Sequence, residues 1–293
     1  MKNEGGGNYV IDQLASYFVS KGHKVVFDFD NSAEVVLINS WQVDLKKLKK
    51  FKKKNPKTRI VHRLDGLARI YGRMDGVDEI AQYANTYADI SIYQSEFIKT
   101  EFLKEGFDLK AGPVIHNPVD TNKFAPPKES LARDNLVIGY ITWSKNKLKG
   151  FEDLNDTISN NPNVNFKLIG NYPIMSDNKN IEFTGTLSRD EIPLEIQKID
   201  ALLTYSENEA CPNHVLEAMS CAKPILYKNS GAMKEIIEDC GFEVSPSTFN
   251  EIITQRKMEF NKIGKRSRNR IIDKFESSDI LKKYLRIIEN ELS

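Results

Sequence analysis

The chain is predicted to be an α/β protein with two parallel-sheet domains. Three observations lead to this prediction: short apolar segments alternate with amphipathic helical segments, one proline-dense stretch interrupts the alternation, and the alternation then starts again. At 293 residues, the chain is longer than one domain of common size and suits two medium domains. We therefore expect one domain over residues 1–118 and a second over residues 119–293, with the hinge in the proline-dense stretch, residues 117–128.

The expected elements follow from apolar periodicity and from helix start and stop signals. In the first domain the predicted strands are 24–29, 35–39, 59–62, 90–94 and 113–116, and the predicted helices are 9–20, 44–54, 78–88 and 96–105. In the second domain the predicted strands are 136–141, 166–169, 181–183, 201–205 and 224–227, and the predicted helices are 151–159, 191–199, 213–220 and 232–238. Residues 277–292 carry a further apolar helical face that needs a surface to pack on.

Composition narrows the class of protein. Hydrophobic residues make up 40% of the chain, the mean hydropathy is −0.46, and the apolar runs are too short to span a bilayer. The first residues lack the apolar core of a signal peptide, so we expect a cytoplasmic protein. A net charge of +1 provides no general attraction to nucleic acid, and no nucleic-acid partner is expected.

Two acids, Glu209 and Glu217, are the most informative residues of the chain. The first falls in the loop after the predicted strand 201–205, and the second lies about one turn into the following predicted helix. In an open parallel sheet, ligands bind beyond the carboxyl ends of the strands, and a helix start favours an anion such as a diphosphate. A fixed carboxylate accepts hydrogen bonds from both hydroxyls of a ribose. The pattern indicates a site for a nucleotide sugar.

This pattern resembles the E-x(7)-E signature of the retaining GT-B glycosyltransferases of group 1, also called family 4. The segments 221–226, 229–231 and 235–237 look like the motifs that follow the signature in that family, and residues 115–120 with Phe124 look like its interdomain linker. The chain departs from the family pattern in two places. Ala210 and Cys211 replace Gly-Phe, and Ala222 stands where glycine is usual, which bears on the shape of the loop and on the choice of donor.

The resemblance implies a GT-B fold with two Rossmann-like domains, an interdomain cleft and a shortened first domain, because no strand precedes the glycines at its start. It also implies that the last helix, about 277–292, crosses back to the first domain. The expected reaction moves a hexosyl group from a nucleotide diphosphate sugar to a hydroxyl acceptor with retention, as in polysaccharide or glycan biosynthesis. Neither a metal nor a cofactor is expected. The base, the sugar and the acceptor, whether saccharide, lipid-linked or protein-linked, stay open.

The resemblance also assigns roles to residues of the second domain. Glu217 would grip the ribose, and Glu209 would bind the transferred sugar, with Asn213 nearby. Residues 143–150 look like the R-x(4)-K-G loop, in which Lys149 would neutralise the donor phosphates. Ser144 stands at the arginine position of that motif and Lys145 follows it, so the second cation is left open.

In the first domain, Gly6 and Gly7 would lie near the diphosphate, or would belong to a flexible terminus. His62 would orient donor hydroxyls or carry a proton, and Asp65 would contact or deprotonate the acceptor. The alternative is that His62 ends a strand and Asp65 begins a turn. Asp28 and Asp30 imitate a D-x-D metal motif, but capping of a strand end is the favoured interpretation.

A lysine-rich helix is predicted after residue 44. It carries eight lysines, the first Lys46 and the last Lys57, with Leu48 and Phe51 on one apolar stripe. Contact with an anionic membrane or an anionic acceptor is one interpretation, and a solvated face over a buried stripe is the other.

Two other functions share the predicted fold. A GT-B nucleotide-sugar epimerase would convert its donor without an acceptor. A non-catalytic relic would bind a nucleotide sugar without turning it over, as the short first domain and the replaced arginine allow.

Overall fold

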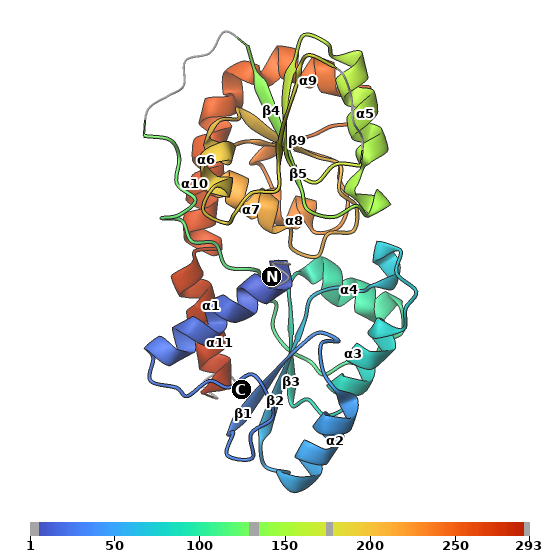
Figure 1. The fold of residues 1–293 in the computed structure, drawn as a ribbon, viewed down its shortest axis with the longest axis vertical. Helices are drawn as coiled ribbons and strands as arrows, with labels where there is room; N and C mark the ends of the chain where they lie inside the picture. Colours follow the sequence, from blue (N-terminus) through green and yellow to red (C-terminus); the bar gives the residue numbers. More distant parts are fainter. Residues whose placement is uncertain (1–5, 129–134, 174–177, 290–293) are drawn as a thin grey trace. The chain divides into compact units, whose positions relative to one another are not determined.

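A computed structural model describes residues 6–128, 135–173 and 178–289. The chain divides into two compact units: unit 1 comprises Met1–Pro118 with Ser278–Ser293, and unit 2 comprises Val119–Ser277. Each unit contains one parallel sheet with helices packed against it, as Figure 1 shows. The α/β fold class with parallel sheets in two domains, predicted from the sequence, is confirmed.

Unit 1 has a three-stranded parallel sheet in the order β1 (Val35–Asn39), β2 (Arg59–Leu64) and β3 (Ile90–Tyr93). Its helices are α1 (Gly6–Ser20), α2 (Leu45–Lys54), the short 3-10 helix η1 (Arg69–Tyr71), α3 (Val77–Asn85), α4 (Glu96–Lys104) and α11 (Ser277–Ile288). The last helix belongs to this unit from its second residue onward.

The sheet of unit 1 is covered on both faces. Side chains alternate along β2, so that Val61 packs with α1 and α11 while its neighbour Ile60 packs with α2 and α3. On α11, Tyr284 and Ile287 are buried against Leu14 of α1. Each large apolar side chain buried in this way contributes about 1.5–3 kcal/mol, and this burial is what attaches the last helix to unit 1.

Two predicted strands of the first domain were wrong. Residues 24–29 form no strand, and Phe27 is 76% exposed. Asp28 accepts a hydrogen bond from the N–H of Phe29, and Asp30 accepts one from the N–H of Ser32, so local turns replace a strand ladder. Of residues 113–116, only Val114 makes a bridge, to Tyr93.

Unit 2 has a six-stranded parallel sheet in the order β6-β5-β4-β7-β8-β9. The strands are β4 (Val137–Thr142), β5 (Asn165–Gly170), β6 (Ile181–Gly185), β7 (Ala201–Thr204), β8 (Ile225–Tyr227) and β9 (Gly241–Glu243). The helices are η2 (Lys147–Lys149), α5 (Phe151–Asn160), α6 (Ile192–Gln197), α7 (Asn213–Ser220), α8 (Met233–Ile237), α9 (Phe249–Arg256), η3 (Lys257–Glu259) and α10 (Phe260–Lys274). The sequence analysis did not assign β9, α9 or α10.

The order of strands in unit 2 reverses at one place. From β4 the chain moves outward through β5 to β6, returns to β7 on the other side of β4, and continues to β9. This is the strand order of a Rossmann fold, in which ligands bind beyond the carboxyl ends of the two strands at the reversal. Residues that follow β4 and β7 therefore occupy the expected ligand position.

Helix α7 ends in a Schellman motif that contains a strained residue. The N–H of Ala222 donates to the carbonyl of Met219 at 3.0 Å, and the N–H of Lys223 donates to the carbonyl of Ala218 at 3.0 Å. The motif requires a left-handed residue, and Ala222 has φ +58°. The left-handed conformation costs alanine about 1–2 kcal/mol relative to the right-handed one, which explains why glycine suits this position.

Replacing Ala222 with glycine should therefore stabilise unit 2 by about 0.5–1 kcal/mol, since relief of strain exceeds the added chain entropy. Urea denaturation followed by circular dichroism measures the change. Ala15→Gly, inside the right-handed helix α1, is the matched control and should destabilise by about 1 kcal/mol. Equal effects at the two positions would contradict the interpretation.

Candidate functional site

Two loops meet at the point where the strand order of unit 2 reverses. One is the loop after β4, which runs through η2 to Gly150, and the other is the loop after β7, residues 205–212. They are joined by a hydrogen bond in which the N–H of Glu207 donates to the carbonyl of Leu148 at 2.7 Å. The two loops are thus connected directly to each other.

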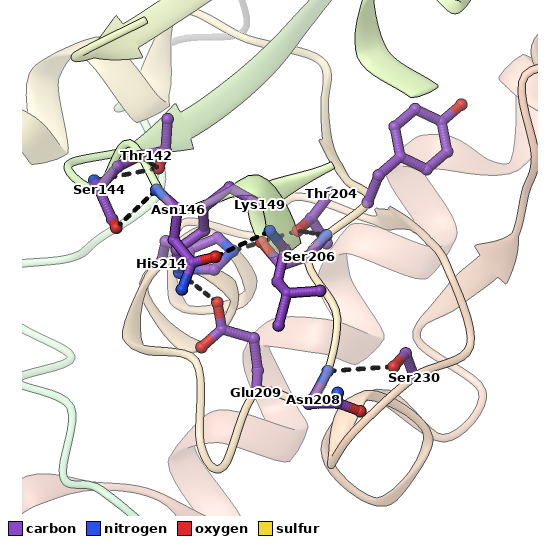
Figure 2. A network of polar contacts seen from close by, with 12 residues as sticks. Thr142, Ser144, Asn146, Lys149, Thr204, Ser206, Asn208, Glu209, His214 and Ser230 are labelled. Atoms are coloured by element: carbon purple, nitrogen blue, oxygen red, sulfur yellow. Dashed lines mark hydrogen bonds and ion pairs between the residues drawn. The ribbon is translucent and has the colours of Figure 1, made fainter. Parts of the chain in front are cut away.

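A partly buried ion pair joins the side chains of the two loops. The ammonium group of Lys149 donates to Oε1 of Glu209, and the two side chains are only 14% and 12% exposed. Figure 2 shows both side chains within the polar network at this end of the sheet. Both residues belong to the predicted donor site, each through a separate motif. The fold brings them into direct contact.

The position of Glu209 is fixed by the loop after β8. The N–H of Ala232 donates to the carbonyl of Glu209 at 2.9 Å, and the N–H of Asn208 donates to Oγ of Ser230 at 3.1 Å (Figure 2). Gly231, with φ +62°, lies so close that a Cβ atom there would stand 2.5 Å from the backbone nitrogen of Glu209. Only glycine fits under the loop that carries this acid.

The position of Lys149 is fixed in a similar way. Gly150, with φ +73°, would place a Cβ atom 2.4 Å from Cβ of Tyr205. The hydroxyl of Tyr140 donates to the carbonyl of Lys149 and accepts from the N–H of Tyr205 at 3.2 Å. The side chain of Tyr140, in the middle of β4, therefore forms hydrogen bonds with both loops.

His214 lies beside the ion pair, and the sequence analysis did not single it out. It is the second residue of α7, and its Nε2 lies 3.3 Å from Oγ1 of Thr204. Burial lowers the pKa of His214 to about 4, against the opposing effect of Glu209. The imidazole is therefore neutral near pH 7 and adds no charge to the ion pair.

Glu217, the second acid of the motif, is buried in α7 and has a different cation as its partner. Nη2 of Arg189 lies 2.5 Å from Oε1 of Glu217, and the Glu217 side chain is 6% exposed. Arg189 comes from the segment between β6 and α6, and its guanidinium lies over the ring of Phe124 at 5.3 Å. Burial raises the pKa of Glu217, and Arg189 opposes that rise. No motif in the sequence analysis indicated Arg189.

The remaining predicted donor residues of unit 2 have less specific surroundings. Ser144 closes a local turn, in which its Oγ accepts from the N–H of Asn146 at 3.1 Å (Figure 2). Lys145 is exposed on the same turn, and Asn213 is the half-buried first residue of α7. A role in binding a donor stays a prediction for all three.

In unit 1, His62 lies inside a strand that continues two residues beyond its predicted end at residue 62. Strand β2 continues to Leu64, and His62 is completely buried within it. Its Nε2 donates to the carbonyl of Ser40 at 2.9 Å, and its Nδ1 accepts from the side-chain amide of Asn85 at 2.9 Å. Both ring nitrogens are thus bonded to protein groups, and burial lowers the pKa of His62 to about 4. This arrangement is that of a structural histidine.

The structure gives the positions of the other candidate residues of unit 1 without testing their roles. Asp65 is half-buried immediately after β2, at the carboxyl end of that strand. Gly6 and Gly7 form the first turn of α1, which starts three residues earlier than predicted, and Gly5 lies outside the described residues. Asp28, from the imitation of a metal motif, is paired with Lys47 at 3.0 Å.

The apolar stripe of α2 is accounted for by packing, and its basic face is exposed. Leu48 lies in the core beside the sheet of unit 1 and Phe51 is also buried, while seven of the eight lysines from Lys46 to Lys57 are exposed. No helix in the described part of the chain is long and apolar enough to cross a membrane. Membrane contact through Lys46 to Lys57 stays a prediction.

Known proteins with a similar sequence or fold are glycosyltransferases and related enzymes. Residues 136–256 match the family described as Glycosyl transferases group 1. This part of the chain is therefore similar to group 1 glycosyl transferases. Among curated proteins, the chain is 30% identical over 167 residues to "Uncharacterized glycosyltransferase MJ1178" of Methanocaldococcus jannaschii, and 28% identical over 118 residues to "Sulfoquinovosyl transferase SQD2" of Arabidopsis thaliana. These matches span 45% and 23% of the two relatives.

Solved structures extend the likeness to the whole chain. HepE of Anabaena, in complex with UDP-glucose, superposes with a TM-score of 0.78 at 16% identity, over 99% of this chain and 97% of that protein. Sucrose-phosphate synthase of Thermosynechococcus elongatus superposes with a TM-score of 0.73 at 14% identity, over 99% of this chain and 80% of that protein. The chain therefore has the GT-B fold of these proteins.

The burial of His62 makes a testable prediction about pH. Its pKa of about 4 in the folded chain lies below the ordinary 6.5, so its contribution to stability is complete above pH 6.5 and is lost as the pH falls toward 4. In His62→Gln, the loss of unfolding free energy between about pH 7 and pH 5 should be smaller than in the wild type by about 2 kcal/mol. Urea titrations at both pH values measure it.

His23→Gln, which changes a half-buried histidine of the same unit, is the matched control. The pH dependence of unfolding in this variant is the reference for the effect of His62→Gln. The same pH dependence in His62→Gln and wild type would show that His62 titrates normally and would contradict the structural role.

Proposed function

We propose that the chain is a glycosyltransferase that moves a hexosyl group from a nucleotide diphosphate sugar to a hydroxyl acceptor. The observation that carries the proposal is the partly buried Lys149–Glu209 ion pair at the strand reversal of unit 2. The match of residues 136–256 to group 1 glycosyl transferases supports it, and so does the GT-B fold shared with a protein solved with UDP-glucose.

The proposed roles follow from the chemistry of the pair. An ammonium group has three N–H donors, so Lys149 can hold Glu209 and a phosphate oxygen at the same time. When the bond between the anomeric carbon and the diphosphate breaks, negative charge grows on the leaving oxygen, and a cation already in position stabilises it. Glu209 accepts hydrogen bonds from the hydroxyls of the transferred sugar. The acceptor oxygen forms the new bond to the anomeric carbon, and its proton passes to the leaving phosphate.

Three parts of the proposal rest on resemblance to the group 1 class. They are retention at the anomeric carbon, independence from metal ions, and a cytoplasmic location. Among the described residues, no three His, Cys, Asp or Glu side chains gather as metal ligands. The diphosphate charge would be met by Lys149 and by the start of α7. Addition of EDTA to the transfer assay tests whether a metal takes part.

A binding panel followed by product analysis tests the function. Thermal shifts with UDP, GDP, ADP and their sugars identify the donor, because a ligand that binds only the folded state raises its apparent stability. Product analysis with that donor separates the candidates. A transferase releases the nucleoside diphosphate, an epimerase returns an isomerised nucleotide sugar, and a relic binds without turnover.

Lys149→Met should lower turnover by about 100-fold or more while the chain still folds, because the cation that meets the leaving diphosphate is removed. Release of nucleoside diphosphate under saturating donor measures this. Lys147→Met is the matched control, since Lys147 lies in the same 3-10 turn but is exposed. Equal activity in the two variants would contradict the assigned role.

We also propose peripheral contact of α2 with an anionic lipid surface. Seven exposed lysines support it, as does the neighbouring Phe27, which is 76% exposed. Each lysine near such a surface contributes about 1 kcal/mol. Flotation with vesicles of phosphatidylcholine, with and without phosphatidylserine, measures the binding.

Removing four of these charges should weaken binding to the anionic vesicles by about 100-fold or more. The variant carries glutamine at Lys46, Lys49, Lys50 and Lys53. A control variant carries glutamine at four exposed lysines of α10 and α11, namely Lys262, Lys265, Lys274 and Lys283. Equal loss in both variants, or equal binding to neutral vesicles, would refute contact through α2.

A further inference from the structure

The carboxyl group of Glu217 is held from outside its own helix. Arg189 reaches it from the segment between β6 and α6, 28 residues earlier in the chain, with Nη2 2.5 Å from Oε1. The Glu217 side chain is 6% exposed and that of Arg189 is 27% exposed. A carboxylate buried to this degree depends on its partner, because desolvation disfavours its charged form.

Arg189 is itself held in place by aromatic stacking. Its guanidinium lies 5.3 Å from the centre of the Phe124 ring, and Phe124 is 1% exposed. The carbonyl of Phe124 accepts hydrogen bonds from Oγ of Ser220 at 2.6 Å and from Nη1 of Arg268 at 2.9 Å. Helices α7 and α10 thus anchor the ring on which the guanidinium rests, so its position does not depend on Glu217 alone.

A second contact ties the same two segments together. Nζ of Lys123 lies 2.6 Å from Oδ1 of Asp190, next in sequence to Phe124 and to Arg189 respectively. Lys123 also lowers the pKa of Glu217, although less than Arg189 does. Glu217 also interacts electrostatically with Cys221, whose thiol pKa is raised to about 12 by burial, so the thiol is uncharged near pH 7.

The contact leaves the acid able to bind a ligand. A carboxylate has two oxygens and accepts about four hydrogen bonds. Arg189 contacts Oε1, so the same group can accept hydrogen bonds from a vicinal diol while the guanidinium fixes its orientation. A ribose presents such a diol, and its two hydroxyls need an acceptor that is both charged and fixed.

We propose that Arg189 is a positioning residue for donor recognition: it holds the Glu217 carboxylate in place as the acceptor for the two ribose hydroxyls. This inference rests on the proposed function, because it requires a ribonucleotide donor. Arg189 acts through Glu217 and does not itself contact the donor.

The test compares Arg189→Gln with wild type in calorimetric titrations. The ligands are the nucleoside diphosphate that binds wild type best and its 2′-deoxy form, each titrated from about pH 6 to about pH 9. Without Arg189, the pKa of Glu217 rises further, so the carboxylate is protonated at a higher pH and loses acceptor capacity there. Affinity of the variant for the ribonucleotide should fall about 10-fold or more at the acid end and recover as the pH rises.

The deoxynucleotide separates a specific effect from a general loss of structure, because a general loss would weaken binding of both nucleotides equally. It lacks one of the two hydroxyls, so Arg189→Gln should weaken its binding much less than that of the ribonucleotide. Arg189→Lys, which keeps a cation, should retain most of the affinity. Arg256→Gln is the control: Arg256 also stacks on a ring, that of Phe242 at 4.6 Å, and pairs with Glu259 in the same unit.

The outcomes separate the two proposals. Equal losses for both nucleotides, or a pH profile identical to that of wild type, would overturn the positioning role while leaving the proposed function intact. If no nucleoside diphosphate binds the wild-type chain, both proposals are overturned. A loss confined to the ribonucleotide and to low pH supports the role of Arg189.

Discussion

The reversal of strand order between β4 and β7 is the constraint on which the site depends. Right-handed crossovers that move in opposite directions from adjacent strands place their helices on opposite faces of the sheet. Figure 1 shows α5 and α7 on the two sides of the unit 2 sheet. Strands β4 and β7 pair only at Ile138 with Ala201 and at Gly139 with Leu202. Their carboxyl ends therefore part, and the loops that follow them, rather than the strands, make contact.

That contact combines charge with backbone geometry. An ion pair that is largely shielded from solvent depends on both partners, so Lys149 and Glu209 stabilise each other where the two loops meet. Gly150 and Gly231 make this possible, because each has a left-handed conformation and no room for a Cβ atom. The ion pair therefore requires the glycines as well as the two charged residues. Any side chain at Gly231 would push away the loop that carries Glu209.

The sequence could predict a site residue when the pattern that indicates it lies within a short stretch of the chain. Lys149 and Glu209 lie just beyond strand ends and within recognisable spacing, so both could be found from the sequence. Arg189 could not, because its partner Glu217 lies on another element and no short spacing links them. The strand β2 was cut short at residue 62 because polar His62 and Arg63 interrupt the apolar run. Their hydrogen bonds to distant residues, which periodicity does not reveal, allow the strand to continue.

Arg63 also explains how the ends of unit 1 are secured. This fully buried guanidinium donates to Oδ1 of Asn117 at 2.8 Å and to the hydroxyl of Tyr284 at 3.1 Å. Asn117 precedes the first passage of the chain into unit 2, and Tyr284 belongs to the helix that follows the second. Inside unit 2, the N–H of Val119 donates to the carbonyl of Phe275 at 2.9 Å, and the N–H of Ser277 donates to the carbonyl of Val119 at 2.9 Å. The chain passes between the units twice. In unit 1, the side chain of Arg63 binds residues next to both passages, and in unit 2 the two passages bind each other. Because buried polar networks are costly unless every member is bonded, a change at Arg63 would disturb both connections together.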